Sequence, residues 1–147
     1  MRGGIRLLGI SVALSMLIAM GCSESTAPDS DRQDALIPAA QDMTLRVGEE
    51  KPVANSVVRL AFGLVVEDSR CPIDAVCIWQ GNAMVELGIR AGMGPTQPLR
   101  INTTLEPRST VWNGIRISLL ELQPAPRAAE PTKPDDYRVT VRLEPVS

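Results

Sequence analysis

The stretch "VRLAFGLVVEDSRCPIDAVCIWQGNAMVELGIR", residues 58–90, contains two alternating apolar segments joined by a polar connection with two cysteines. Apolar side chains occupy even positions in residues 58–67 and odd positions in residues 78–90. Because successive side chains of a strand point to opposite faces, both segments are predicted to be strands with one buried face. The predicted inward residues are Val58, Leu60, Phe62, Leu64 and Val66, then Trp79, Gly81, Ala83, Val85, Leu87 and Ile89, with Asn82 among those on the outer face.

The same two-residue period recurs along the rest of the chain from residue 42 onward, and no segment there keeps a period of 3.6 residues. Turn-forming residues separate the alternating segments, including an Asn-Gly pair typical of a two-residue hairpin turn. We therefore predict an all-β domain over residues 42–147, either a small antiparallel β-sandwich or a partly open barrel of about six to seven strands. The further predicted strands are 43–47, 99–103, 115–119 and 137–143, and the predicted turns are 91–95, 113–114 and 124–134.

The N-terminal stretch "MRGGIRLLGISVALSMLIAMGC", residues 1–22, has two arginines followed by an uncharged apolar run over residues 7–20. A basic start, an apolar run of this length and a small residue before the cut are typical of a secretory signal peptide, which we predict over residues 1–21. The run is short for a transmembrane helix, which needs roughly 20 apolar residues.

The residues "AMGC", Ala19 to Cys22, resemble the cleavage box of bacterial lipoproteins. The resemblance implies that Cys22 is lipidated on sulfur and becomes the first residue after cleavage, and multiple acyl chains anchor a protein stably. In this family, a residue other than aspartate after the cysteine, here Ser23, favours transit to the outer membrane. The expected location is therefore the bacterial cell envelope, lipid-anchored in the outer membrane, and the alternative is ordinary cleavage without lipid.

Residues 22–41 are rich in serine, alanine, aspartate and proline and contain no aromatic residue. Such a composition cannot form a packed core, so we predict a flexible tether between the lipid and the domain. Its three aspartates, Asp29, Asp31 and Asp34, lack the central glycine and closing glutamate of a calcium-binding EF-hand loop.

The chain has three cysteines, and if Cys22 carries lipid, Cys71 and Cys77 remain as a pair. Paired thiols outside the cytosol usually oxidise, so we predict a structural disulfide between them. Redox dithiols typically enclose two residues rather than five, and two cysteines without histidine are too few ligands for zinc, so we expect neither metal nor cofactor. We predict that Trp79 packs in the core near this disulfide, with Gly81 leaving room for the indole; the rival is an exposed Trp79 in a binding platform.

The composition argues against two classes of function, nucleic acid binding and enzymatic catalysis. The formal net charge is −2, or −4 once residues 1–21 with their two arginines and no acids are removed, and no dense basic run suggests nucleic acid binding. The chain has no histidine, the usual general base. The adjacent carboxylates of each acidic pair would point to opposite faces of a strand. We therefore expect no enzyme. The acidic pairs are Glu49 and Glu50, Glu67 and Asp68, and Asp135 and Asp136.

The expected function is a non-catalytic interaction or accessory role with an envelope protein as partner. The first alternative is a protease inhibitor or ligand-binding module that uses the disulfide-clamped loop 70–77, with Arg70, Ile73 and Trp79 as recognition residues. The second is a carboxylate-dependent glycan hydrolase. The segment "EDSRCP…CIWQG" resembles an element of small bacterial lipoproteins and secreted β-domains, a resemblance that implies no activity.

Overall fold

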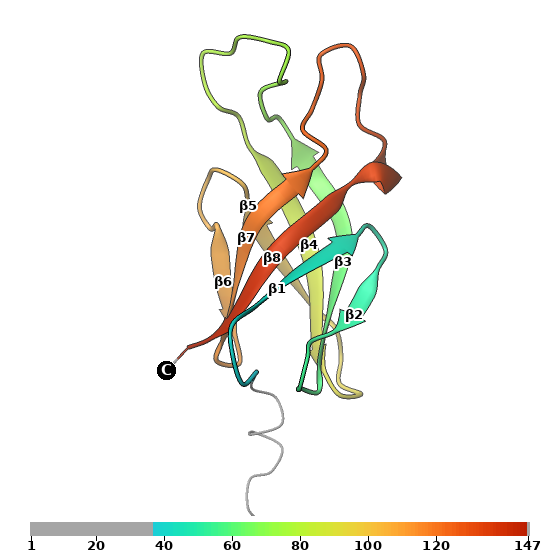
Figure 1. Cartoon of the computed structure of the whole chain (residues 1–147), viewed down its shortest axis with the longest axis vertical. Coiled ribbons are helices and arrows are strands. Elements are labelled where there is room, and N and C mark those ends of the chain that lie inside the picture. Colours follow the sequence, from blue (N-terminus) through green and yellow to red (C-terminus); the bar gives the residue numbers. More distant parts are fainter. Residues whose placement is uncertain (1–36, 147) are drawn as a thin grey trace, which may run out of the picture.

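The computed structural model describes residues 37–146, so the predicted signal peptide and Cys22 lie outside the described residues. Eight strands form two four-stranded antiparallel sheets that enclose the core (Figure 1). The strands are β1 (Gln41–Arg46), β2 (Glu50–Pro52), β3 (Val58–Asp68), β4 (Ala83–Ala91), β5 (Gln97–Asn102), β6 (Ser109–Trp112), β7 (Ile115–Gln123) and β8 (Arg138–Pro145), and a 3-10 turn, η1, covers Pro134–Asp136.

One sheet has the order β1-β8-β7-β6 and the other β2-β3-β4-β5. The prediction of an all-β antiparallel fold is confirmed, and of its two forms the sandwich is the one observed, because the sheets do not close into a barrel. β2 and β6 were not predicted, since three or four residues are too few to show an alternation. No helix in residues 37–146 is long and apolar enough to span a bilayer.

The core lies between the sheets and is mainly aliphatic, and Phe62 is its largest fully buried side chain. The alternation predicted for β7 and β8 is confirmed by Ile115 and Ile117 and by Val139, Val141 and Leu143, all fully buried. Asn113 and Gly114 form the two-residue turn between β6 and β7, with φ of 45° and 77°, as the Asn-Gly pair predicts.

In β3 the predicted alternation fails in its second half. Leu64 and Val66 were predicted inward but are 46% and 43% exposed. The pairing of β3 with β4 shifts between Phe62 and Leu64 and again between Val65 and Glu67. Each such bulge moves the following side chains to the other face, so an even-position pattern cannot persist through them.

β4 begins at Ala83 instead of residue 78, and two predictions for the residues just before it are therefore wrong. Trp79 lies in the loop and is 74% exposed, so its predicted core position is wrong. Asn82, predicted to face outward, is buried. The reason is local: Gly81 has a φ of +72°, which breaks the strand that the parity argument assumed to be continuous.

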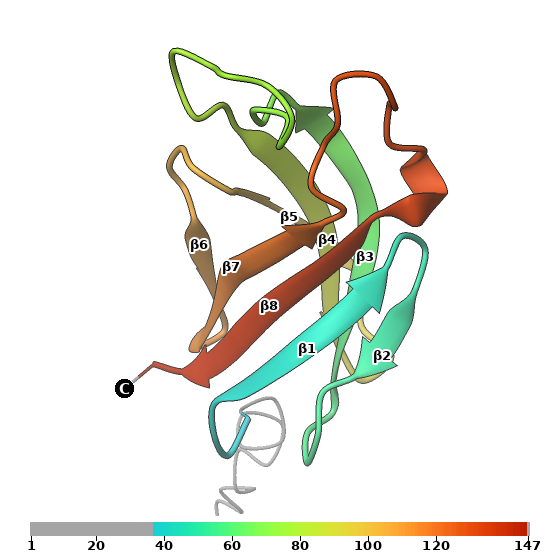
Figure 2. The same cartoon turned by 45° about the horizontal axis from the view of Figure 1, so that its top comes forward.

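The folded domain begins before the predicted boundary at residue 42. Ile37 is 2% exposed and belongs to the core, and β1 starts at Gln41. The described chain enters at the end of the sandwich where β8 finishes, and the long β3–β4 loop lies at the opposite end (Figures 1 and 2).

Candidate recognition site

Three connections gather at one end of the sandwich, which we call the loop end (Figure 2). They are residues 69–82 between β3 and β4, residues 103–108 between β5 and β6, and residues 124–137 between β7 and β8. The β3–β4 connection carries all three loop residues singled out from the sequence, Arg70, Ile73 and Trp79, and both paired cysteines.

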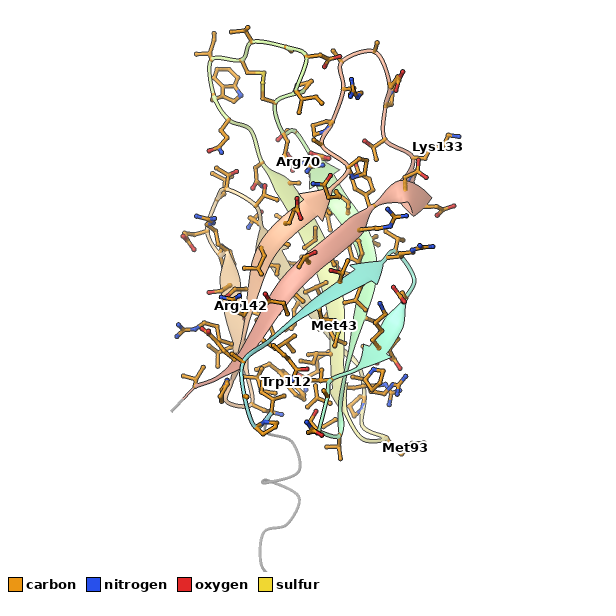
Figure 3. All side chains as sticks on the ribbon, in the orientation of Figure 1. Met43, Arg70, Met93, Trp112, Lys133 and Arg142 are labelled. Atoms are coloured by element: carbon orange, nitrogen blue, oxygen red, sulfur yellow. A yellow bond between two sulfur atoms is a disulfide. The ribbon has the colours of Figure 1, made fainter. Side chains whose placement is uncertain are left out.

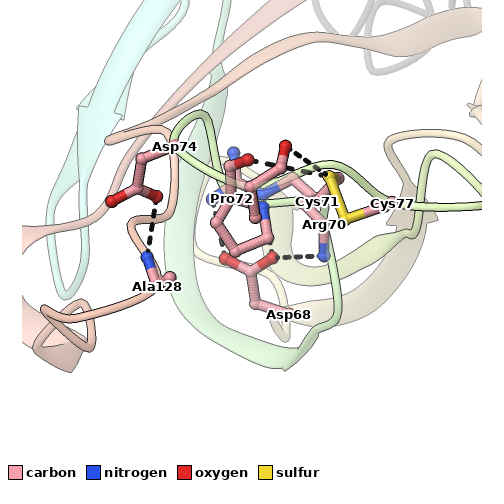
Figure 4. Close-up of a disulfide and its surroundings, with 8 residues drawn as sticks. Asp68, Arg70, Cys71, Pro72, Asp74, Cys77 and Ala128 are labelled. Carbon is pink, nitrogen blue, oxygen red and sulfur yellow. Dashed lines mark hydrogen bonds and ion pairs between the residues drawn. A yellow bond between two sulfur atoms is a disulfide. The ribbon is translucent and has the colours of Figure 1, made fainter.

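Cys71 and Cys77 form the predicted disulfide, with a Cα–Cα distance of 6.0 Å (Figure 4). The clamped loop is also fastened to the β7–β8 loop. The Ile73 N–H donates to the Pro126 carbonyl at 3.0 Å, and the Ala128 N–H donates to Asp74 Oδ1 at 2.9 Å. The disulfide and these two bonds hold the loop in one conformation.

The base of the loop closes around Gly81. The Ser69 N–H donates to the Asn82 carbonyl at 2.6 Å and the Cys71 N–H to the Gln80 carbonyl at 3.0 Å. The chain packs so closely that a Cβ on Gly81 would lie 1.9 Å from the Ser69 carbonyl oxygen. Gly81 therefore serves this backbone approach, and not the room for an indole that the sequence suggested.

Arg70 points into the domain. Its Nε and Nη2 contact Asp68 at 2.8 and 2.7 Å, while Nη1 donates to the Leu122 carbonyl at 2.5 Å and Nη2 to the Pro124 carbonyl at 2.9 Å. Tyr137 Oη donates to Asp68 at 3.0 Å. The guanidinium thus joins the two sheets at the loop end (labelled in Figure 3) and is not presented to a partner.

The charges of this cluster are mutually dependent. Burial alone raises the pKa of Asp68, but the hydrogen bonds from Arg70 outweigh it and hold the pKa below its ordinary value. Burial, and then the bond to Asp68, raise the pKa of Tyr137. The cluster is therefore one ionised carboxylate matched to one guanidinium.

Sequence reasoning missed Asn82, which connects two loops of this end. Its Oδ1 accepts from the N–H groups of Thr104 and Leu105 at 3.1 and 3.3 Å, and its Nδ2 donates to Asn102 Oδ1 at 2.9 Å. A buried amide with these partners fixes residues 103–105 against the base of the clamped loop. The only sequence signal is an asparagine immediately after a turn glycine.

Apolar side chains project from the clamped loop into solvent. Val76 and Ile78 are 104% and 95% exposed, and Ile73, three residues before Val76, is also exposed. We call Ile73, Val76, Ile78 and Trp79 the apolar tip. Single exposed apolar residues need no explanation, but four large ones within seven residues of one loop are typical of a binding surface.

The acidic pair Glu49 and Glu50 forms ion pairs with Lys51, Arg59 and Arg90. Hydrogen bonds from Arg90 and Arg59 lower the pKa of Glu50 to about 2, and the Arg46 N–H and Lys51 lower the pKa of Glu49. Carboxylates with lowered pKa values stay ionised at neutral pH and do not donate protons. Within residues 37–146, no three histidine, cysteine, aspartate or glutamate side chains gather as metal ligands.

Replacing both Cys71 and Cys77 with serine is expected to lower the free energy of unfolding by about 2–3 kcal/mol. The chain-entropy account gives about 2.4 kcal/mol for a closed loop of seven residues. Urea denaturation of the purified chain with and without reductant measures the effect. A serine variant as stable as the oxidised wild type would contradict a stapling role.

Fold and site together define a small antiparallel β-sandwich that presents a disulfide-clamped apolar loop at one end. Comparison with known proteins gives no match to a family model, to a curated protein or to a solved structure.

Proposed function

We propose that this protein is a non-catalytic interaction module of the bacterial cell envelope, anchored by lipid on Cys22, that binds an envelope protein through the apolar tip. The observation that carries the proposal is the exposure of four large apolar side chains on a loop fixed by a disulfide and by two bonds to its neighbour. The signal sequence and the "AMGC" box support the anchor.

The energetics favour binding at this tip. Burying one such side chain contributes roughly 1.5–3 kcal/mol. A loop already held in one conformation loses little further entropy when it binds. An exposed tryptophan at the edge of an aliphatic cluster is a common energetic anchor of protein interfaces.

The arrangement of the two ends also fits the proposal. The described chain enters at one end and the tip lies at the other (Figure 1). An anchor on Cys22 would therefore join the domain at the end opposite the tip. The segment from Cys22 to Ile37 reaches at most roughly 50 Å when extended.

Protease inhibition is a variant of the same use of the loop. Because the Arg70 guanidinium is held by Asp68 and two carbonyls, Val76 and Ile78 would be the residues offered to a protease. Assay of the purified chain against proteases that accept aliphatic residues tests this variant, and inhibition that survives Val76→Ser would contradict it.

Cys22→Ala is expected to abolish membrane attachment. Without a thiol at this position no acyl chain can be added, and the chain should move to the soluble fraction. Fractionation of expressing cells, together with labelling by a fatty-acid probe, measures both effects. Retention of the label by the variant would contradict the anchor.

The double variant Val76→Ser/Ile78→Ser is expected to lose partner binding with less than about 0.5 kcal/mol change in stability, because both side chains are already in solvent. Met93→Ser is the matched control, since Met93 is equally exposed at the opposite end (Figure 3). Capture from envelope extract with each protein as bait measures binding. An equal set of captured proteins for wild type and double variant would contradict the proposal.

A further inference from the structure

A hollow of about 350 Å³ lies at the loop end, beside the clamped loop. Arg70 and Gln80 line it from the β3–β4 connection, Thr103 and Thr104 from the β5–β6 loop, and four consecutive residues, 119–122, from β7. Alternate residues of a strand point to opposite faces. Four consecutive residues can therefore line one hollow only where it meets the edge of the strand.

The exposed edge belongs to β7, and it begins where the pairing of β7 with β6 ends. The ladder between β6 and β7 ends at the pair Ser109 and Ser118, after which the Leu119 N–H still donates to the Arg108 carbonyl at 3.2 Å. The reciprocal bond of an antiparallel pair is missing, because the Arg108 N–H donates to Glu106 Oε2 at 3.0 Å instead. Within residues 37–146, the Leu119 carbonyl is left without a donor on this edge.

The exposed edge ends at Arg70, whose Nη1 donates a hydrogen bond to the Leu122 carbonyl at 2.5 Å. The N–H and C=O of one strand residue point the same way, so the Leu122 N–H also faces the hollow. Among the backbone hydrogen bonds outside the strand ladders, none in the described part of the chain has this N–H as its donor.

A bulge explains why Leu119 and Leu122 share this edge. In a regular strand, residues three apart turn their backbone groups to opposite edges. The pairing of β7 with β8 shifts between Leu119 and Glu121, which inserts one residue and brings both onto the same edge. The result is one free carbonyl and one free N–H in a single hollow, enclosed by β6 and by Arg70.

We propose that this hollow receives one residue of an extended polypeptide segment of the partner, whose N–H donates to the Leu119 carbonyl and whose C=O accepts from the Leu122 N–H. The inference rests on the proposed function and names the partner's chemistry. A peptide unit supplies both a donor and an acceptor, as in strand addition to a sheet edge. The Arg70 charge is already matched by Asp68, so the guanidinium does not require an anionic ligand in the hollow. The exposed Leu120 offers apolar contact to the segment's side chains.

The test uses a displayed library of random 12-residue peptides, selected against the full chain in detergent micelles. Selected peptides are expected to slow hydrogen exchange of the Leu122 amide at least tenfold, measured by NMR. Leu120→Arg, which introduces a charge at the hollow, is expected to raise their Kd at least tenfold. Val111→Arg, at an exposed position of β6 outside the hollow, is the control and should leave Kd unchanged.

The outcomes separate this inference from the proposed function. One outcome is that the selected peptides bind Val76→Ser/Ile78→Ser more weakly, bind Leu120→Arg as tightly as wild type, and do not slow exchange of the Leu122 amide. This outcome would contradict binding in the hollow and would still support binding by the apolar tip. Failure to select any peptide, or selection of peptides insensitive to both sets of changes, would also overturn the inference, while capture by the tip decides the proposed function independently.

Discussion

Gly81→Ala is expected to lower the free energy of unfolding by at least about 3 kcal/mol. The left-handed φ of +72° alone costs a residue with a Cβ roughly 1–2 kcal/mol. The new Cβ would also lie 1.9 Å from the Ser69 carbonyl oxygen and 2.8 Å from the Arg70 Cα. These are backbone atoms, so relief requires breaking the hydrogen bonds at the base of the clamped loop.

Urea denaturation followed by tryptophan fluorescence measures this loss, because Trp112 is buried and reports on the core. Gly92→Ala is the matched control, since Gly92 has a φ of +50° but a Cβ there would meet no atom within 4 Å. It should lose only the conformational cost. Equal losses for the two variants would show that the close contact at Gly81 contributes nothing.

Arg70→Met is expected to destabilise the domain by about 3–5 kcal/mol, the usual effect of removing one partner of a largely buried ion pair. Asp68 would remain as an uncompensated charge, and the carbonyls of Leu122 and Pro124 would lose their donor. Arg116→Met is the control, because Arg116 is exposed and its ion pair with Glu144 is long, at 3.9 Å. It should change stability by less than about 0.5 kcal/mol.

The pH dependence of the Arg70→Met effect tests its cause. In the wild type the pKa of Asp68 is lowered from 3.8, so its contribution is present above that value and is lost as pH falls through the folded pKa. In the variant only burial acts strongly on Asp68, which raises its pKa, so protonation at low pH favours the folded state. The difference in unfolding free energy between the two proteins should therefore shrink below about pH 4. A difference constant with pH would exclude Asp68 as the cause.

The fold was predictable where alternation runs unbroken. β7 and β8 bury their odd-numbered apolar residues as far as the bulge after Leu119, and Asn113-Gly114 forms the predicted turn. The bulges of β3 were not predictable, because a bulge inserts one residue without a required residue type and leaves the composition unchanged. Leu64 and Val66 were misplaced for this reason.

The site was predictable only in its covalent part. Cys71 and Cys77 pair as their number and setting indicated. The predictions for Trp79 and Asn82 were wrong because they assumed that the alternation of inward and outward side chains continues through Gly81, where the chain turns. The inward course of Arg70 depends on carbonyls more than fifty residues away along the chain, which no local pattern contains.

Site-specific photo-crosslinking in intact cells tests the recognition role of the apolar tip most directly. A benzophenone side chain at Ile78 should give a discrete crosslinked product that disappears when Val76 is also changed to serine, and the same group at Met93 should give none. Products of equal yield at both positions, or no product at Ile78, would contradict the recognition role of the tip.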